Sequence, residues 1–233
     1  FDEDKNSIKV GIGDDGQKNF NTKLRGEISD NDFVSFTFSK REIDNSWRDN
    51  NEFDTTQASL KFGHIFDDES TIENELSYTE SNLNLLASMT RAEFETFKQT
   101  GEQHNTSNTW QNSARDSKIV SLNSKYEKEA GSITYRPRIY FTHWEHFHPV
   151  TGLINDATDN NVFGTDLEFD WIHKLVSKDA NLVGGVTLKL DKSNDAKKYE
   201  YKDVQKNGTG RILKTLSNEK GDLASTEDSS AFL

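Results

Sequence analysis

The stretch Phe33-Val34-Ser35-Phe36-Thr37-Phe38-Ser39 alternates apolar and polar residues with a period of two. The alternation returns twice before Leu83, and the later apolar positions are Ala58, Leu60, Phe62 and Phe66, then Ile72, Leu76 and Tyr78. A pleated strand points successive side chains to opposite faces, so each segment is predicted to be a β-strand with one apolar face. The fold depends on what covers that face.

The overall composition favours lipid as the cover. Only 32% of the 233 residues are hydrophobic, 29% are charged, and the mean hydropathy is -0.86. A soluble two-layer sandwich must fill a shared interior from both sheets, which needs more apolar side chains. A barrel in a membrane needs apolar residues only on its outer face, and its interior can stay polar.

Several other classes of protein are disfavoured. The chain has no cysteine, which excludes disulfides and thiolate metal sites, and its net charge of -12 argues against nucleic-acid binding. No apolar run is long enough for a membrane-spanning helix, and no serine elbow, phosphate-binding glycine loop or spaced zinc set is present. We therefore expect no enzyme, no resident metal and no cofactor. No signal peptide is recognisable and the chain begins at Phe1, so we expect that an upstream part has been removed or lies outside this sequence.

The connections between the expected strands alternate between short and long. The short ones are Ser29–Asp32, Asp67–Ser70, Glu129–Gly131 and Ser177–Ala180, and the long ones are Asp44–Asp54, Leu85–Asp116, Pro149–Asn160 and a lysine-rich stretch up to about Thr226. Up-and-down strands of a membrane barrel have tight turns at one rim and long loops at the other. The sequence therefore predicts an all-β, antiparallel, up-and-down transmembrane β-barrel, in part, with roughly ten strands. Thr90 to Glu93 has the capping-box spacing, which predicts a short helix in the longest loop.

Several segments also resemble TonB-dependent outer-membrane receptors. The early ones are Ser29-Asp30-Asn31-Asp32-Phe33, Ser46-Trp47-Arg48-Asp49-Asn50, Phe53-Asp54 and Leu60-Lys61-Phe62-Gly63-His64. The later ones are Met89-Thr90-Arg91-Ala92-Glu93-Phe94, His148-Pro149-Val150-Thr151-Gly152, Val162-Phe163-Gly164-Thr165-Asp166-Leu167-Glu168 and Asp228-Ser229-Ser230-Ala231-Phe232. The likeness covers most of the chain, but its motifs are diffuse.

The resemblance implies a siderophore-receptor-like protein in the outer membrane of a Gram-negative bacterium. Such a receptor contacts outer-membrane lipid, binds a ferric siderophore or another scarce ligand, and is driven through its plug by an energy-coupling inner-membrane complex. An intact barrel of this kind has about 22 strands. Residues 1–233 are therefore expected to be the N-terminal part of the barrel, without the plug and the C-terminal strands. The identity of the ligand does not follow from the sequence.

The candidate ligand-binding residues lie on one strand. By the alternation of Ile139 and Phe141, the opposite, lumen-directed face holds the residues that we expect to meet a ligand near the extracellular end: Arg136, Arg138, Trp144, His146 and His148. The arginines have a competing role, which is ion pairing with Asp166, Glu168 or Asp170 on the next strand. His146 and His148 lie about 7 Å apart by the strand rise, too far for easy shared metal ligation without a bend.

Two other protein classes remain open. One is a small self-contained outer-membrane barrel of eight to ten strands with a structural or adhesive role, which should end in a finished strand. The other is a secreted soluble β-protein, in which a second layer of the same molecule would cover the apolar faces.

Overall fold

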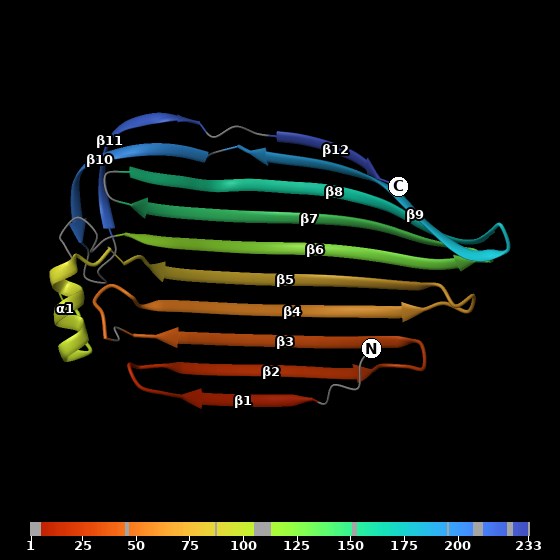
Figure 1. Cartoon of the computed structure of the whole chain (residues 1–233), viewed down its shortest axis with the longest axis horizontal. Helices are drawn as coiled ribbons and strands as arrows, with labels where there is room; N and C mark the ends of the chain where they lie inside the picture. The colour runs from red at the N-terminus through yellow and green to blue at the C-terminus, as the bar shows by residue number, and fades with distance from the viewer. Residues whose placement is uncertain are drawn as a thin grey trace.

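The computed structural model describes residues 6–44, 47–86, 88–104, 113–150, 153–194, 196–206, 212–222 and 226–232. Within these ranges the chain forms one antiparallel sheet and one helix (Figure 1). The strands are β1 (Ser7–Ile12), β2 (Lys18–Glu27), β3 (Asp32–Ile43), β4 (Phe53–Ile65), β5 (Thr71–Asn84), β6 (Ala114–Ala130), β7 (Ile133–Val150), β8 (Leu153–Leu175), β9 (Lys178–Ser193), β10 (Ala196–Lys206), β11 (Ile212–Asp222) and β12 (Thr226–Phe232). The helix is α1 (Arg91–Thr100).

Neighbours in sequence are neighbours in the sheet from β1 to β8, as expected for up-and-down strands. Beyond β8 the strands are interrupted but the pairing continues. β9 pairs with the C-terminal part of β8, and β10 pairs with its N-terminal part. β11 then pairs with β10, and β12 with β9. The described chain therefore crosses the sheet about ten times, in agreement with the sequence prediction.

The apolar positions of eight strands meet in one row across the sheet. Residues paired across neighbouring strands lie on the same face, and this row consists of Leu24, Phe36, Leu60, Leu76, Leu122, Phe141, Phe163 and Leu190. The adjacent row on the opposite face consists of Lys23, Thr37, Ser59, Ser77, Ser121, Thr142, Val162 and Asp191. We call these surfaces the apolar face and the polar face.

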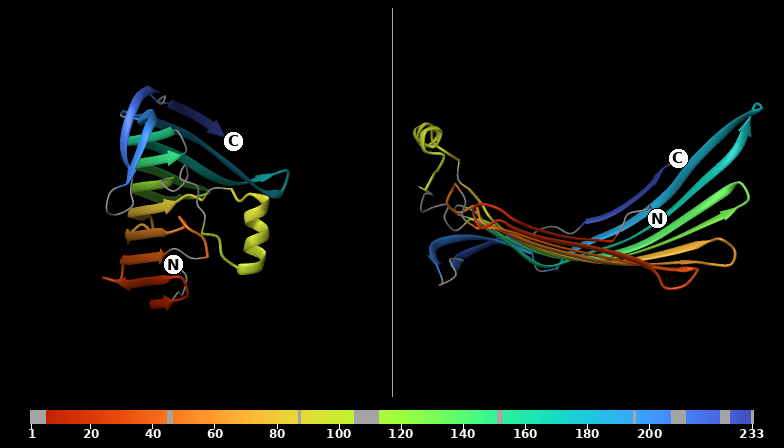
Figure 2. Two further views of the ribbon diagram at one scale, coloured as in Figure 1. Left: turned by 90° about the vertical axis from the view of Figure 1, so that its left-hand side faces the viewer. Right: turned by 90° about the horizontal axis from the view of Figure 1, so that it is seen from below.

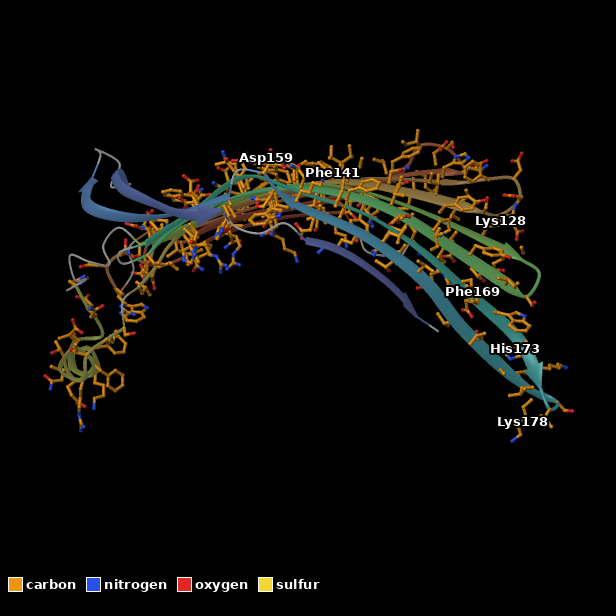
Figure 3. The ribbon with its side chains drawn as sticks, turned by 90° about the horizontal axis from the view of Figure 1, so that it is seen from above. Lys128, Phe141, Asp159, Phe169, His173 and Lys178 are labelled. Atoms are coloured by element: carbon orange, nitrogen blue, oxygen red, sulfur yellow. The ribbon has the colours of Figure 1, made fainter. Side chains whose placement is uncertain are left out.

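No second layer covers the apolar face in the described part of the chain. Figures 2 and 3 show a single bent layer of strands with α1 standing off one end, and Figure 3 shows side chains on both sides of this layer. Among the described residues, only two hydrophobic side chains are buried, Ala114 and Ala157, whereas Leu122 is 50% exposed and Phe163 is 54% exposed. Water would make such a surface costly, and lipid would not. The soluble sandwich considered above is therefore disfavoured.

The tight turns are staggered in the way that tilted strands require. The row of pairs that begins at Phe33 reaches β8 at Asp166. β3 begins one residue before Phe33, but β8 continues to Leu175, nine residues after Asp166. If the tight turns share one plane, this offset of about eight residues over five strand spacings corresponds to a tilt of about 45°. Strands of membrane barrels tilt by about 35–45°.

Several connections differ from the sequence prediction. Residues 149–150 and 153–160, predicted to be a loop, belong to β7 and β8, which pair almost to their tips. The lysine-rich stretch before Thr226 contains β10 and β11. The last short turn is Val176-Ser177, both with positive φ, rather than Ser177–Ala180. Strand residues outside the apolar band can be polar on both faces of the sheet. Such strands show no alternation of apolar and polar residues, so their sequences resemble those of loops.

The apolar face can be tested with a matched pair of substitutions in the middle of β6. In phospholipid vesicles, Leu122→Arg should lower the free energy of unfolding by about 2–4 kcal/mol, because it places a charge in hydrocarbon. Ser121→Arg, one residue away on the polar face, should cost less than about 1 kcal/mol. Denaturant titration followed by tryptophan fluorescence measures both values. Equal losses for the two variants would contradict a lipid-facing apolar row.

Tyr140 and Gly164 form a close cross-strand pair on the polar face between β7 and β8. A Cβ atom built on Gly164 would lie 2.2 Å from Cζ of Tyr140, so the phenol ring occupies the space that a side chain would need. The Arg138 guanidinium lies 5.3 Å from the centre of the same ring. Glycine at position 164 therefore allows the aromatic ring to pack flat against the neighbouring strand.

We expect Gly164→Ala to destabilise the folded chain by about 1–3 kcal/mol, because the new methyl group displaces the Tyr140 ring. The same substitution in a Tyr140→Ala background should cost markedly less, since the clash is then removed. Denaturant unfolding of the two single variants and the double variant gives the coupling energy. If the losses of unfolding free energy in the two single variants add up to the loss in the double variant, the contact between Tyr140 and Gly164 does not constrain the sheet.

Candidate functional site

The predicted site residues beyond position 143 lie past the end of the apolar band. One row on the apolar face runs through Lys40, Thr56, Glu80, Lys118 and Glu145. Four of its five residues are charged, and the Nζ atom of Lys40 lies 2.5 Å from an Asp54 carboxylate oxygen. A charged row does not suit hydrocarbon, so the band ends below it. Polar-face residues from Trp144 onward therefore lie at the rim, on the same end of the sheet as α1 (Figure 1).

At this rim β7 presents a ladder of three rings. The Trp144 and His146 ring centres lie 6.2 Å apart, and those of His146 and His148 lie 5.4 Å apart. The pairing of β7 with β8 shifts register between Trp144 and His146, which marks a β-bulge. The extra residue is in β8, where residues 158 and 159 lie opposite Glu145, so β7 keeps its alternation and its three rings stay on the polar face.

Arg115, at the start of β6, joins this ladder. Its Nε group donates a hydrogen bond of 3.5 Å to Nε2 of His146. Burial lowers the pKa of His146, and repulsion from the protonated form of His148 and from Arg115 acts in the same direction. The pKa of His148 is lowered by burial and then by Arg115. Both shifts favour the neutral imidazoles, and the lone pair on His146 Nε2 accepts from Arg115.

Arg136 and Arg138 are not part of the ladder. They lie on the same face but about 20 Å further down β7, judged by six residues of strand rise. Arg136 contacts Glu168 and Glu127, each at 3.2 Å, and the Nε group of Arg138 donates to Asp166 at 2.7 Å. The ion pairing that the sequence suggested is confirmed. These residues line an open cavity of about 490 Å³ together with Lys125, Asp166, Glu168 and Thr187.

The connections at the same rim form a compact loop unit. The capping box predicted at Thr90 and Glu93 is present at the start of α1. The ring of Phe97 on α1 lies 4.8 Å from that of Trp47 in the β3–β4 connection. Arg48 is 9% exposed, and its Nε group donates to Oε1 of Gln103 at 2.7 Å. These contacts join the β3–β4 connection to the β5–β6 connection, which contains α1, although α1 itself has no buried residue.

His104 is a charged contact between the same two loops. Its Nδ1 atom lies 3.1 Å from Asp49, and its Nε2 atom lies 3.1 Å from Glu102. The hydrogen bond to Asp49, followed by that to Glu102, raises the pKa of His104. Asp49 and Gln103 are also joined through the backbone, because the Asp49 N–H donates to the Gln103 carbonyl at 3.2 Å.

Sequence reasoning missed Arg115 and the contact between Arg48 and Gln103. Arg115 fell inside the expected loop, although it follows the same alternation as Ser117 and Ser121 on the polar face of β6. Arg48 and Gln103 are 55 residues apart, and no local pattern links them. In the described residues no group of three or more His, Asp or Glu side chains is arranged to hold a metal ion. The part of the chain that is described also has no helix with the length and hydrophobicity needed to span a membrane.

No protein-family model matches the chain, and no curated protein matches its sequence. Solved structures do match. The FpvAI receptor in complex with pyocin S2 covers 94% of this chain with a TM-score of 0.66 at 9% identity. The ferric-catecholate import receptor Fiu of E. coli K12 covers 88% with a TM-score of 0.66 at 11% identity, and the ferric citrate transporter FecA covers 92% with 0.64 at 10% identity. The fold is that of part of a TonB-dependent receptor barrel.

This chain spans 29 to 36% of the length of these three receptors. It resembles non-enzymatic outer-membrane receptors. In such a receptor barrel the polar face lines the lumen and the apolar face meets lipid. On this sheet the ring ladder of β7 lies at the loop-bearing end of the polar face, and the paired arginines lie further from that end.

The loop contact through His104 should weaken as pH rises. Because the pKa of His104 is raised in the folded chain, its contribution is fully present below the ordinary value of about 6.5 and is lost as pH rises through the raised pKa. Hydrogen exchange of residues 97–104 should therefore be faster at pH 8.5 than at pH 6, after correction for intrinsic rates. The His104→Asn variant should remove this difference. A wild-type chain with no pH-dependent difference would rule out the contact.

Proposed function

We propose that this chain is part of the barrel of an outer-membrane receptor that takes up a ferric siderophore or a similar scarce ligand in a TonB-dependent way. One observation supports this most directly. The described strands form a single layer with an uncovered apolar face and a polar opposite face, and siderophore receptors match that layer over about nine-tenths of the chain. Two of these receptors are named for ferric catecholate import and ferric citrate transport. The cell outer membrane is accordingly the proposed location.

The proposed ligand-contacting residues are the ones predicted from the sequence. Trp144, His146 and His148 would meet a ligand first, because they lie on the polar face at the loop-bearing rim. Their rings offer flat surfaces and neutral nitrogen atoms to a ligand. Arg136 and Arg138 lie deeper, where their carboxylate partners already balance their charge. These arginines would contact an anionic ligand only by sharing or exchanging those partners.

The self-contained barrel with a structural or adhesive role receives less support. Within the described residues β1 pairs only with β2, so the sheet is open along the β1 edge. An open edge in lipid leaves backbone donors and acceptors unsatisfied, and further strands or a second chain would have to cover them. The proposed partners are therefore outer-membrane lipid, the rest of a receptor with its plug, and the inner-membrane energy-coupling complex.

The uptake role is tested in cells that contain the gene for this chain. Deleting the gene should abolish uptake of at least one radiolabelled ferric chelate, and uptake should also stop when the inner-membrane proton gradient is collapsed. A Trp144→Ala variant should lower uptake at subsaturating ligand by at least fivefold, because it removes a proposed contact surface. Trp171→Ala, on the apolar face, serves as the matched control and should have little effect.

Immunoblots of membrane fractions must show equal amounts of the two variants in the outer membrane. Unchanged uptake of every ferric chelate tested after deletion would overturn the proposal. Recovery of the wild-type chain in the soluble fraction would overturn it as well.

A further inference from the structure

His146 and His148 are close enough to hold one metal ion together. A zinc ion binds imidazole nitrogen at about 2.0–2.1 Å, so two rings on one tetrahedral ion have their centres about 5 Å apart. Two residues of strand rise separate the backbone positions of His146 and His148 by about 7 Å. Their ring centres lie 5.4 Å apart, so the two side chains converge above the strand.

A neutral imidazole has one nitrogen with a lone pair and one that carries a proton. In His146 the Nε2 atom accepts a hydrogen bond from Arg115, so Nε2 is the atom with the lone pair. The charged groups outside the pair that act on it are Arg115 and Asp116. The place of the two histidines at the rim leaves them partly exposed, so water or a ligand can fill the remaining coordination positions.

We propose that His146 and His148 form a two-histidine site for one divalent cation of the zinc, nickel and copper class, at the rim of the polar face. This class prefers imidazole nitrogen, whereas Mg²⁺ prefers oxygen ligands. The ion replaces bound water, and no covalent or redox step is involved. The proposal rests on the geometry of β7 and does not require the uptake function.

Arg115 opposes metal binding at this site. Its Nε group donates to His146 Nε2 and places a positive charge 3.5 Å from that atom. An incoming cation must displace Arg115 from Nε2, because Nδ1 carries the proton while Nε2 accepts. Binding through Nδ1 would move that proton to Nε2 and break the same hydrogen bond. Removing the guanidinium should therefore strengthen binding, which is the reverse of what a purely structural role for Arg115 predicts.

Isothermal titration with Ni²⁺ and Zn²⁺, on the untagged full chain in detergent micelles at pH 7.5, tests the site. The wild type should bind one equivalent of each ion and show no heat with Mg²⁺. His146→Ala and His148→Ala should each weaken binding at least tenfold, and Arg115→Ala should strengthen it severalfold. His143→Ala is the matched control, because His143 lies on the apolar face of the same strand and contacts Asn161 at 3.0 Å.

Far-UV circular dichroism in the same micelles checks that each variant keeps its strands. His146→Asn provides a second variant of similar size in case the alanine variant does not fold. The proposal is overturned if the folded wild type does not bind Ni²⁺ or Zn²⁺. It is also overturned if His143→Ala weakens binding as much as His146→Ala and His148→Ala do.

Discussion

The hydrogen-bonded ladder between neighbouring strands is the interaction on which the whole described sheet depends. The sheet is one layer thick, and no hydrophobic core holds its strands together. In hydrocarbon every backbone donor and acceptor must be satisfied inside the protein, so the ladder is obligatory there. The apolar row from Leu24 to Leu190 then only has to be compatible with lipid. A chain of low hydrophobic content can therefore form a large sheet.

The same hydrogen-bonded pairing decides which residues lie on the polar face. A slip of one residue between β7 and β8 would move Trp144, His146 and His148 from the polar face to the apolar face. Contacts that hold this register therefore also keep the three rings on the polar face. On the polar face, at the level of the apolar band, Tyr140 packs over Gly164 and Arg138 pairs with Asp166, and both contacts join β7 to β8.

The sequence predicted those parts of the fold in which apolar and polar residues alternate. Phe36, Leu60 and Leu76 alternate with polar residues because one face of the sheet is apolar and the other polar, and the strands follow from this alternation. Residues 153–160 lie past the band and have no such pattern, so they were wrongly predicted as loop although they pair with β7. The arginine ion pairs followed from spacing on adjacent strands. Arg48 with Gln103 did not, because that contact depends on how two distant loops fold.

The polar face of β7 has two parts that differ in charge: the paired arginines in one part and the uncharged rings near the rim in the other. Away from the rim, Arg136 and Arg138 have carboxylate partners within 3.2 Å, so this part of the polar face has little net charge with which to attract an ion. At the rim the ladder of β7 consists of neutral rings, with Arg115 beside His146. Recognition at the rim would therefore rely on ring contact and metal coordination more than on long-range attraction. Such contacts act only over short distances, whereas a strongly charged surface would attract a ligand from further away.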